Sequence, residues 1–156
     1  MKSEAPLAPG VKVPPPVIYV IALLFGFGLD YLWPGKLPPQ VPWGMIGGII
    51  IGVSVAIVPF VLIRFKRRRT SFSVFQSATA LITDGPYQLS RNPAYAALTL
   101  LYIGIGFFFS NGWVLALCIP VVMSIDRWVI PREERHLEAQ FGEAYVQYKT
   151  TTRRWV

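Results

Sequence analysis

The sequence has little charge and few chemically reactive side chains. Of its 156 residues, 15% are charged, one is a histidine and one is a cysteine. A single cysteine excludes an intramolecular disulfide, and Cys118 lies within an apolar run, where we expect it to be a small packing residue. No glycine-rich dinucleotide fingerprint follows a predicted strand, which argues against a nicotinamide enzyme. We expect no metal site, and any chemistry must rest on a few glutamates, arginines and tyrosines.

The apolar residues come in blocks that lack charge altogether. Val17–Leu29, Val41–Ile63 and Pro93–Ile125 contain no charged side chain. A helix needs about 20 apolar residues to cross a hydrocarbon core about 30 Å thick. The third block is long enough for two helices if the chain turns at residues 110–112, and the first reaches this length by continuing to Trp33. The sequence therefore predicts an all-α, polytopic membrane protein with about four transmembrane helices and a cytoplasmic C-terminal helical segment, with spans at 17–33, 43–64, 93–109 and 113–130.

A proline-rich segment precedes the first span. Residues 1–16 include five prolines and are predicted to be extended or disordered. Residues 17–156 then form one membrane domain. Two alternatives are weaker: a soluble core helix would show a polar face, and a cleaved signal peptide would be followed by a small-residue cleavage site.

The positive charge lies next to the second and fourth spans. A net charge of +7 in a soluble chain would suggest a nucleic-acid partner, but here the basic residues cluster at 64–69 and from Arg127 onward. The connections between spans one and two and between three and four contain Lys36 as their one basic residue. Basic residues beside helix ends mark the cytoplasmic side. We therefore expect both termini in the cytoplasm, contact with anionic membrane lipids and no nucleic-acid partner.

Several local features carry further expectations. Residues 70–91 mix polar and apolar side chains and are expected to lie at the interface or to fold over the helix ends. Asn92 is expected to cap the helix that Pro93 opens, and Gly142 to end a helix over Arg132–Phe141. His136 lies on that helix and is expected to be exposed. The glycines of the second span serve either an internal helix contact or a dimer contact.

Three groups of residues sit at the predicted cytoplasmic side in a set order. They are Gly85-Pro86-Tyr87 with Arg91-Asn92-Pro93-x-Tyr95, then Gly104-x-Gly106, and then Glu133-Glu134 followed by Phe141-Gly142-x-x-Tyr145-x-x-Tyr148. Each group alone is common in structural turns and helix starts. Their order and spacing resemble the integral membrane methyltransferases of the isoprenylcysteine carboxyl methyltransferase and phospholipid methyltransferase group. The resemblance covers about residues 79–155.

The resemblance implies a cofactor, S-adenosylmethionine, and a pocket for it. The residues implied to bind it are Gly85, Pro86, Tyr87, Arg91, Asn92, Pro93, Tyr95, Gly104, Gly106, Glu133 and Glu134. Glutamates suit its hydroxyls or positive charge, an arginine suits its carboxylate, and tyrosines suit its adenine or sulfonium region. The chain departs from the family pattern at Asn92, where histidine is usual, and asparagine cannot transfer a proton near neutral pH.

The resemblance also implies a lipophilic or lipidated methyl acceptor. A carboxylate acceptor needs no general base, which agrees with the scarcity of histidine, and Arg127 is the candidate catalytic residue that would orient it. Two other readings stay open. One is a membrane reductase of the steroid reductase type, and the other is a non-enzymatic membrane scaffold or transport subunit, although the apolar blocks lack the ionisable residues that transporters use.

Overall fold

The computed structural model describes residues 13–67 and 81–155, and most of these residues are helical. No strand forms among them, so the predicted all-α fold class is confirmed. α1 begins at Pro15, two residues before the predicted start, because proline in the first helical turn loses no hydrogen bond. The elements in chain order are α1 (Pro15–Leu32), α2 (Trp43–Arg67), the 3₁₀ helix η1 (Gly85–Gln88), α3 (Pro93–Phe108), α4 (Gly112–Ser124), the π-helical turn η2 (Ile125–Val129), α5 (Ile130–Phe141) and α6 (Glu143–Thr151).

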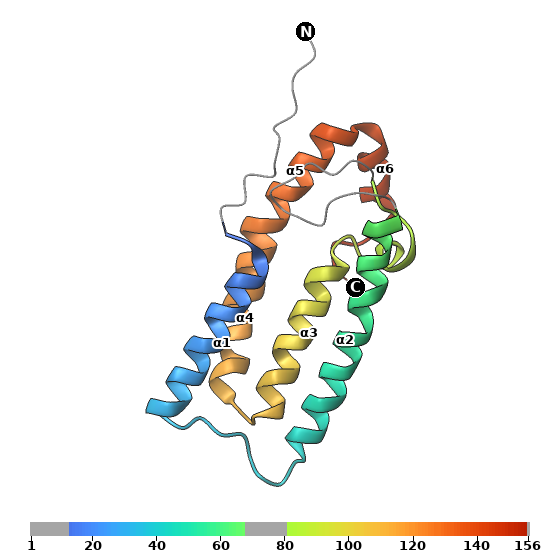
Figure 1. The fold of residues 1–156 in the computed structure, drawn as a ribbon. Coiled ribbons are helices and arrows are strands. Elements are labelled where there is room, and N and C mark those ends of the chain that lie inside the picture. The colour runs from blue at the N-terminus through green and yellow to red at the C-terminus, as the bar shows by residue number, and fades with distance from the viewer. Residues whose placement is uncertain (1–12, 68–80, 156) are drawn as a thin grey trace.

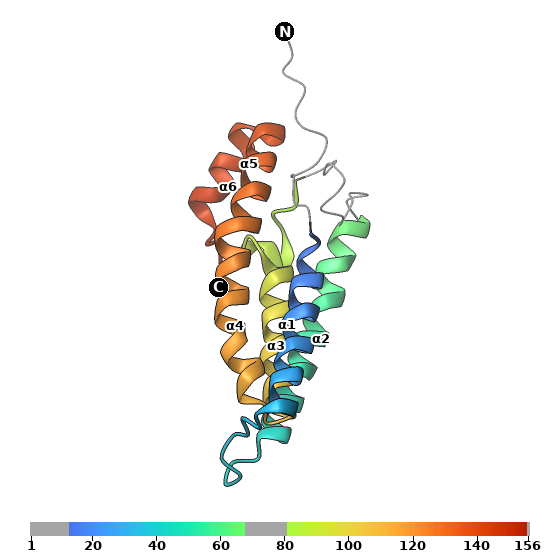
Figure 2. The ribbon, with the colours of Figure 1, turned by 90° about the vertical axis from the view of Figure 1, so that its left-hand side faces the viewer.

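The four long helices form an up-and-down bundle (Figure 1). α2 packs along α3, α3 packs on α4, and α4 packs on α1. The start of α1, the end of α2 and the start of α3 lie at the end of the bundle that carries α5 and α6, as Figure 2 also shows. The motif residues near the starts and ends of these helices therefore gather at one end of the bundle. Which side of the membrane this end faces stays a prediction.

Within the part of the chain that the structure describes, three helices are long and apolar enough to cross a membrane. They are α1, α2 as far as Val61, and the continuous helix Gly112–Phe141, while α3 is shorter at 16 residues. The continuous helix has 30 residues and is about 45 Å long, against about 30 Å of hydrocarbon. The first part of this helix is apolar, whereas α5 carries charged side chains, and the position of α5 outside the membrane stays a prediction. The chain is an integral membrane protein.

A π-helical turn joins this span to α5. The Ile130 amide donates to the carbonyl of Ile125, five residues earlier. Pro131 follows directly and has no amide hydrogen to donate. The wider turn accommodates the proline without breaking the helix. The helix therefore continues through Pro131 from the span into α5.

The opposite end of the bundle is closed by contacts between two connections. The Gly112 amide donates to the Gly35 carbonyl at 2.8 Å, and the Leu37 amide donates to the Ser110 carbonyl at 3.1 Å. Ser110 has a positive φ of 51°, and the Asn111 side chain accepts from the Val114 amide at 2.9 Å, capping α4. The predicted turn at residues 110–112 is confirmed.

α2 and α3 approach closely at paired glycines. A Cβ atom built on Gly47 would lie 2.2 Å from the Phe108 amide nitrogen and 2.6 Å from the Gly104 carbonyl oxygen. Backbone atoms cannot move aside as the end of a flexible side chain can. Gly47 therefore serves an internal helix contact, one of the two roles left open by the sequence.

Replacing Gly47 with alanine is expected to destabilise the bundle. The added methyl group forces α2 and α3 apart, and overpacking of this kind costs about 1–3 kcal/mol. Gly52→Ala is the matched control, because Gly52 lies on the same helix and its Cβ would meet nothing within 4 Å. Thermal unfolding in detergent measures both. Equal melting temperatures for the two variants would contradict the close contact.

Candidate active site

A glutamate and a tyrosine from distant motifs meet where the apolar spans end. Tyr95, in the first turn of α3, donates its hydroxyl to Glu133 Oε1 on α5 at 2.5 Å. Tyr95 is buried and Glu133 is half-buried. The structure thus joins two predicted site residues that are 38 positions apart in the chain.

The position of Tyr95 is supported from two neighbouring side chains. The Thr99 hydroxyl donates to the Tyr95 carbonyl at 2.8 Å, and the Tyr19 hydroxyl lies 2.8 Å from the same Thr99 oxygen. Tyr19 is on α1, so these contacts link α1 to the start of α3. Tyr19 also packs edge-on against Tyr102, with ring centroids 5.9 Å apart. The Tyr95–Glu133 pair is therefore held by α1, α3 and α5 together.

The surroundings of Glu133 raise the pKa of its carboxyl toward neutral pH. Burial raises the pKa of Glu133 to about 7, the Tyr95 hydrogen bond opposes this rise, and the negative charge of Glu134 adds to it. Near neutral pH such a carboxyl changes readily between its neutral and charged forms. A half-buried carboxyl of this kind is suited to receive a cationic or hydroxyl-bearing ligand.

Glu134 has a different environment from its neighbour. Its carboxylate is paired with Arg91 Nη2 at 3.2 Å and with Arg154 Nη2 at 2.8 Å. The Glu134 side chain is 9% exposed and that of Arg91 is 12% exposed. Arg91 Nη1 also donates to the Lys149 carbonyl at 3.3 Å. These charges are satisfied within the protein, and two predicted cofactor residues are thus engaged with each other.

The residues after α6 form a strap, which we define as residues 152–155, across the start of α3. The Arg91 amide donates to the Arg153 carbonyl at 2.9 Å. The Arg154 carbonyl accepts from the Asn92 side-chain amide at 3.0 Å and from the Ser90 hydroxyl at 3.2 Å. Asn92 occupies the position before α3, but its side chain makes no capping hydrogen bond. The expected side-chain cap is therefore wrong: the Asn92 side chain is turned to the strap, where its NH2 group donates to the Arg154 carbonyl, and its oxygen does not accept from the first turn of α3.

The π-helical turn directs one more carboxylate to the strap. Asp126 Oδ1 accepts from the Trp155 indole at 2.9 Å and lies 3.5 Å from Arg154 Nη1. Sequence reasoning missed Asp126, Arg154 and Trp155 as partners of the motifs. The one available signal was the pair Arg154-Trp155 itself, a basic and an aromatic side chain in the predicted cytoplasmic segment.

The Gly-Pro-Tyr group meets the tyrosine tail of the chain. Gly85 has a φ of 64°, which favours glycine and opens η1 with Pro86 in its first turn. The Tyr148 hydroxyl donates to the Tyr87 carbonyl at 2.6 Å. Burial raises the pKa of Tyr87, and the nearby charge of Glu133 contributes to this rise. Tyr87 thus lies near the Tyr95–Glu133 pair.

Three predicted site residues lie elsewhere. A Cβ on Gly104 would meet Ile51 at 2.8 Å, and one on Gly106 would meet Leu115 at 2.6 Å, so both glycines serve helix packing. Gly104 is nine residues from Tyr95, about 14 Å along α3. Arg127 is exposed on the π-helical turn and makes no polar contact with the described residues. The binding role of the glycines and the catalytic role of Arg127 stay predictions.

His136 is buried, and the expectation that it is exposed is wrong. It is 5% exposed, and neither ring nitrogen has a hydrogen-bond partner in the part of the chain that the structure describes. The helix over Arg132–Phe141 was predicted correctly and ends at Gly142, whose φ is 54°. The error arose because composition identifies a helix outside the membrane but does not reveal which of its faces is covered.

Comparisons with known proteins find a matching family model and a plant relative. The family model described as phospholipid methyltransferase matches residues 43–144. The chain is 32% identical over 68 residues to protein-S-isoprenylcysteine O-methyltransferase B of Arabidopsis thaliana. The matched stretch is 44% of this chain and 34% of the plant protein. The match therefore spans about a third of the plant protein's length.

A bacterial relative is covered almost completely. An uncharacterised protein of Haemophilus influenzae is 32% identical over 62 residues, which is 40% of this chain and 98% of that protein. No solved structure matches the chain. The family model extends over more than half of the sequence and includes Tyr87, Tyr95 and both glutamates. The chain therefore belongs to the phospholipid methyltransferase family.

Proposed function

We propose that this protein transfers a methyl group from S-adenosylmethionine to a lipophilic acceptor at the membrane surface. The observation that carries the proposal is the hydrogen-bonded pair of buried Tyr95 and half-buried Glu133. The pair lies where the apolar spans end and within the stretch matched by the family model. A structural ion pair would consume the charge of Glu133 as it does that of Glu134. Among the described residues, Glu133 instead accepts a hydrogen bond from the Tyr95 phenol and pairs with no basic side chain, which supports a role for its carboxylate toward a ligand.

The side chains present suit the proposed cofactor. S-adenosylmethionine carries a sulfonium, an ammonium, a carboxylate and ribose hydroxyls, and when bound it supplies an activated methyl group. Glu133 offers a negative charge and an acceptor oxygen for the cationic groups or hydroxyls. Arg91 Nε is buried and makes no hydrogen bond to the described residues, so this N–H suits a carboxylate.

The chain's own residues would contribute mainly alignment and exclusion of water. Holding two reactants in line can lower a barrier by roughly 7–11 kcal/mol. Tyr87 and Tyr95 border Glu133 and offer aromatic faces that attract a cation. A carboxylate acceptor reacts without losing a proton, so the site would need no general base for it.

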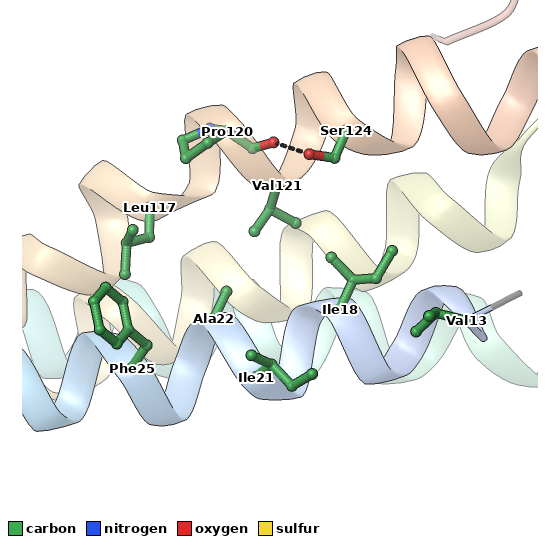
Figure 3. A pocket seen from close by; sticks show the side chains of 9 residues that line it. All are labelled: Val13, Ile18, Ile21, Ala22, Phe25, Leu117, Pro120, Val121 and Ser124. Atoms are coloured by element: carbon green, nitrogen blue, oxygen red, sulfur yellow. Dashed lines mark hydrogen bonds between the residues drawn. The ribbon is translucent and has the colours of Figure 1, made fainter.

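A groove between α1 and α4 supports a lipophilic acceptor. Figure 3 shows this groove of about 450 Å³, whose lining is predominantly apolar and includes Ile18 and Phe25 from α1 and Leu117 from α4. It reaches Ser124, two residues before Asp126. Ile18 also precedes Tyr19 in the chain. The Tyr19 hydroxyl contacts the Thr99 hydroxyl, which in turn donates to the Tyr95 carbonyl. A hydrocarbon tail in this groove would bring the acceptor's head group to the Tyr95–Glu133 end of the bundle.

Glu133→Gln is expected to weaken S-adenosylmethionine binding at least about tenfold. Glutamine keeps the shape and an acceptor for Tyr95 but removes the charge. Affinity of the parent protein should rise as the pH increases through about 7, the pKa of Glu133, because the carboxylate form attracts the cationic cofactor. The variant should lose this rise. Calorimetric titration of the detergent-solubilised protein measures both effects.

The matched control is Glu138→Gln, the same change on the same helix. Glu138 is 45% exposed and pairs with Lys149, so this variant should bind as the parent does. A folded parent protein that shows no affinity up to millimolar cofactor would refute the enzyme assignment. Equal affinity of the parent and Glu133→Gln would remove Glu133 from the site.

Ala22→Trp is expected to fill the groove and slow methyl transfer. Ala22 lines the groove on α1, so the larger side chain displaces the acceptor's tail and should raise the KM for a lipid acceptor. Cofactor affinity should stay unchanged, because the groove lies within the membrane-spanning helices. Gly28→Ala is the control, since its Cβ would meet nothing within 4 Å. Unchanged kinetics with Ala22→Trp would exclude the groove as the tail site.

A further inference from the structure

His136 is a buried polar side chain that the proposed reaction leaves without a role. It is 5% exposed, and both Nδ1 and Nε2 make no hydrogen bond to any described residue. Burying polar atoms without partners costs free energy, so native proteins rarely keep them unless a ligand or a function uses them. The described residues contain no group of metal ligands around it, which leaves a hydrogen-bonding ligand as the natural partner.

The helix geometry places His136 beside Glu133. Residues three apart on a helix are neighbours on its surface, with Cβ atoms about 5–6 Å apart. Both side chains belong to α5, and Glu133 faces Tyr95 at the start of α3. His136 lies one turn further along α5, and α5 extends away from the bundle (Figure 1). His136 thus continues the Glu133 face in the direction that leaves the membrane.

This direction separates the two substrates of the proposed reaction. A lipophilic acceptor reaches Glu133 from the bilayer side, whereas a water-soluble cofactor arrives from the aqueous side. The part of the site beyond Glu133 therefore suits the cofactor. A neutral imidazole offers one N–H donor and one acceptor nitrogen, and ribose hydroxyls and adenine nitrogens supply both complements.

We infer that His136 is a cofactor-binding residue whose ring hydrogen-bonds the nucleoside portion of S-adenosylmethionine, next to Glu133. This inference rests on the proposed function. It assigns binding rather than proton transfer to the chain's single histidine, and it explains why a polar ring is kept in a buried place on α5.

The test compares stability and binding in His136→Leu. Leucine has a similar size but no polar atoms, so the cofactor-free variant should melt about 2–4 °C higher than the parent while binding S-adenosylmethionine at least about tenfold more weakly. Binding of 5′-methylthioadenosine, which keeps the nucleoside and lacks the amino-acid part, should weaken by the same factor. His136→Gln or His136→Asn should recover part of the affinity, since each restores a donor and an acceptor near one ring nitrogen.

If His136 served only the fold, its replacement could not raise the melting temperature and at the same time weaken cofactor binding. A lower melting temperature for His136→Leu, or unchanged affinity for the two nucleoside ligands, would overturn the inference. Ala139→Gln, on the exposed face of α5, is the control and should bind as the parent does. Failure of the parent protein itself to bind S-adenosylmethionine would instead overturn the proposed function, and that measurement is read before any variant is compared.

Discussion

The carboxylate of Glu134, held between Arg91 and Arg154, joins three parts of the chain that are far apart in sequence. Arg91 comes from the segment before α3, Glu134 from α5 and Arg154 from the strap after α6. Removing one partner of a buried ion pair leaves an uncompensated charge, which is strongly unfavourable. The pair therefore fixes where the strap and α5 lie relative to the start of α3. The position of Tyr95 opposite Glu133 depends on that placement.

Adjacent residues on a helix point about 100° apart, and this divides the two glutamates between two tasks. Glu134 faces the arginines and the strap, whereas Glu133 faces Tyr95 and, in our proposal, the cofactor. Of the two adjacent glutamates, Glu134 thus holds the segments of the fold together, and Glu133 is the one that we propose binds the cofactor. Asp126, turned toward Trp155 by the π-helical turn, reinforces the assembly and takes no part in the proposed binding.

The features set by local physics could be predicted from the sequence. Charge-free runs identified the four long helices, three of which are long and apolar enough to span a membrane. Pro93 and Gly142 marked helix ends, and the turn at residues 110–112 followed from its composition. Features that depend on distant partners could not. The burial of His136, the loss of the Asn92 cap to the strap and the pairing of Arg91 with Glu134 each require knowledge of which segments meet. The ordered motifs indicated the right end of the bundle, but Gly104 and Gly106 proved to lie in helix contacts.

The central claim is that the Arg91–Glu134 contact holds this end of the bundle together. A double-mutant cycle on Arg91→Gln and Glu134→Gln, followed by denaturant unfolding in detergent without cofactor, tests it most directly. The account predicts that each single variant is clearly less stable than the parent and that the two changes are coupled by about 1–3 kcal/mol. Additive effects, with no coupling between the two positions, would contradict it.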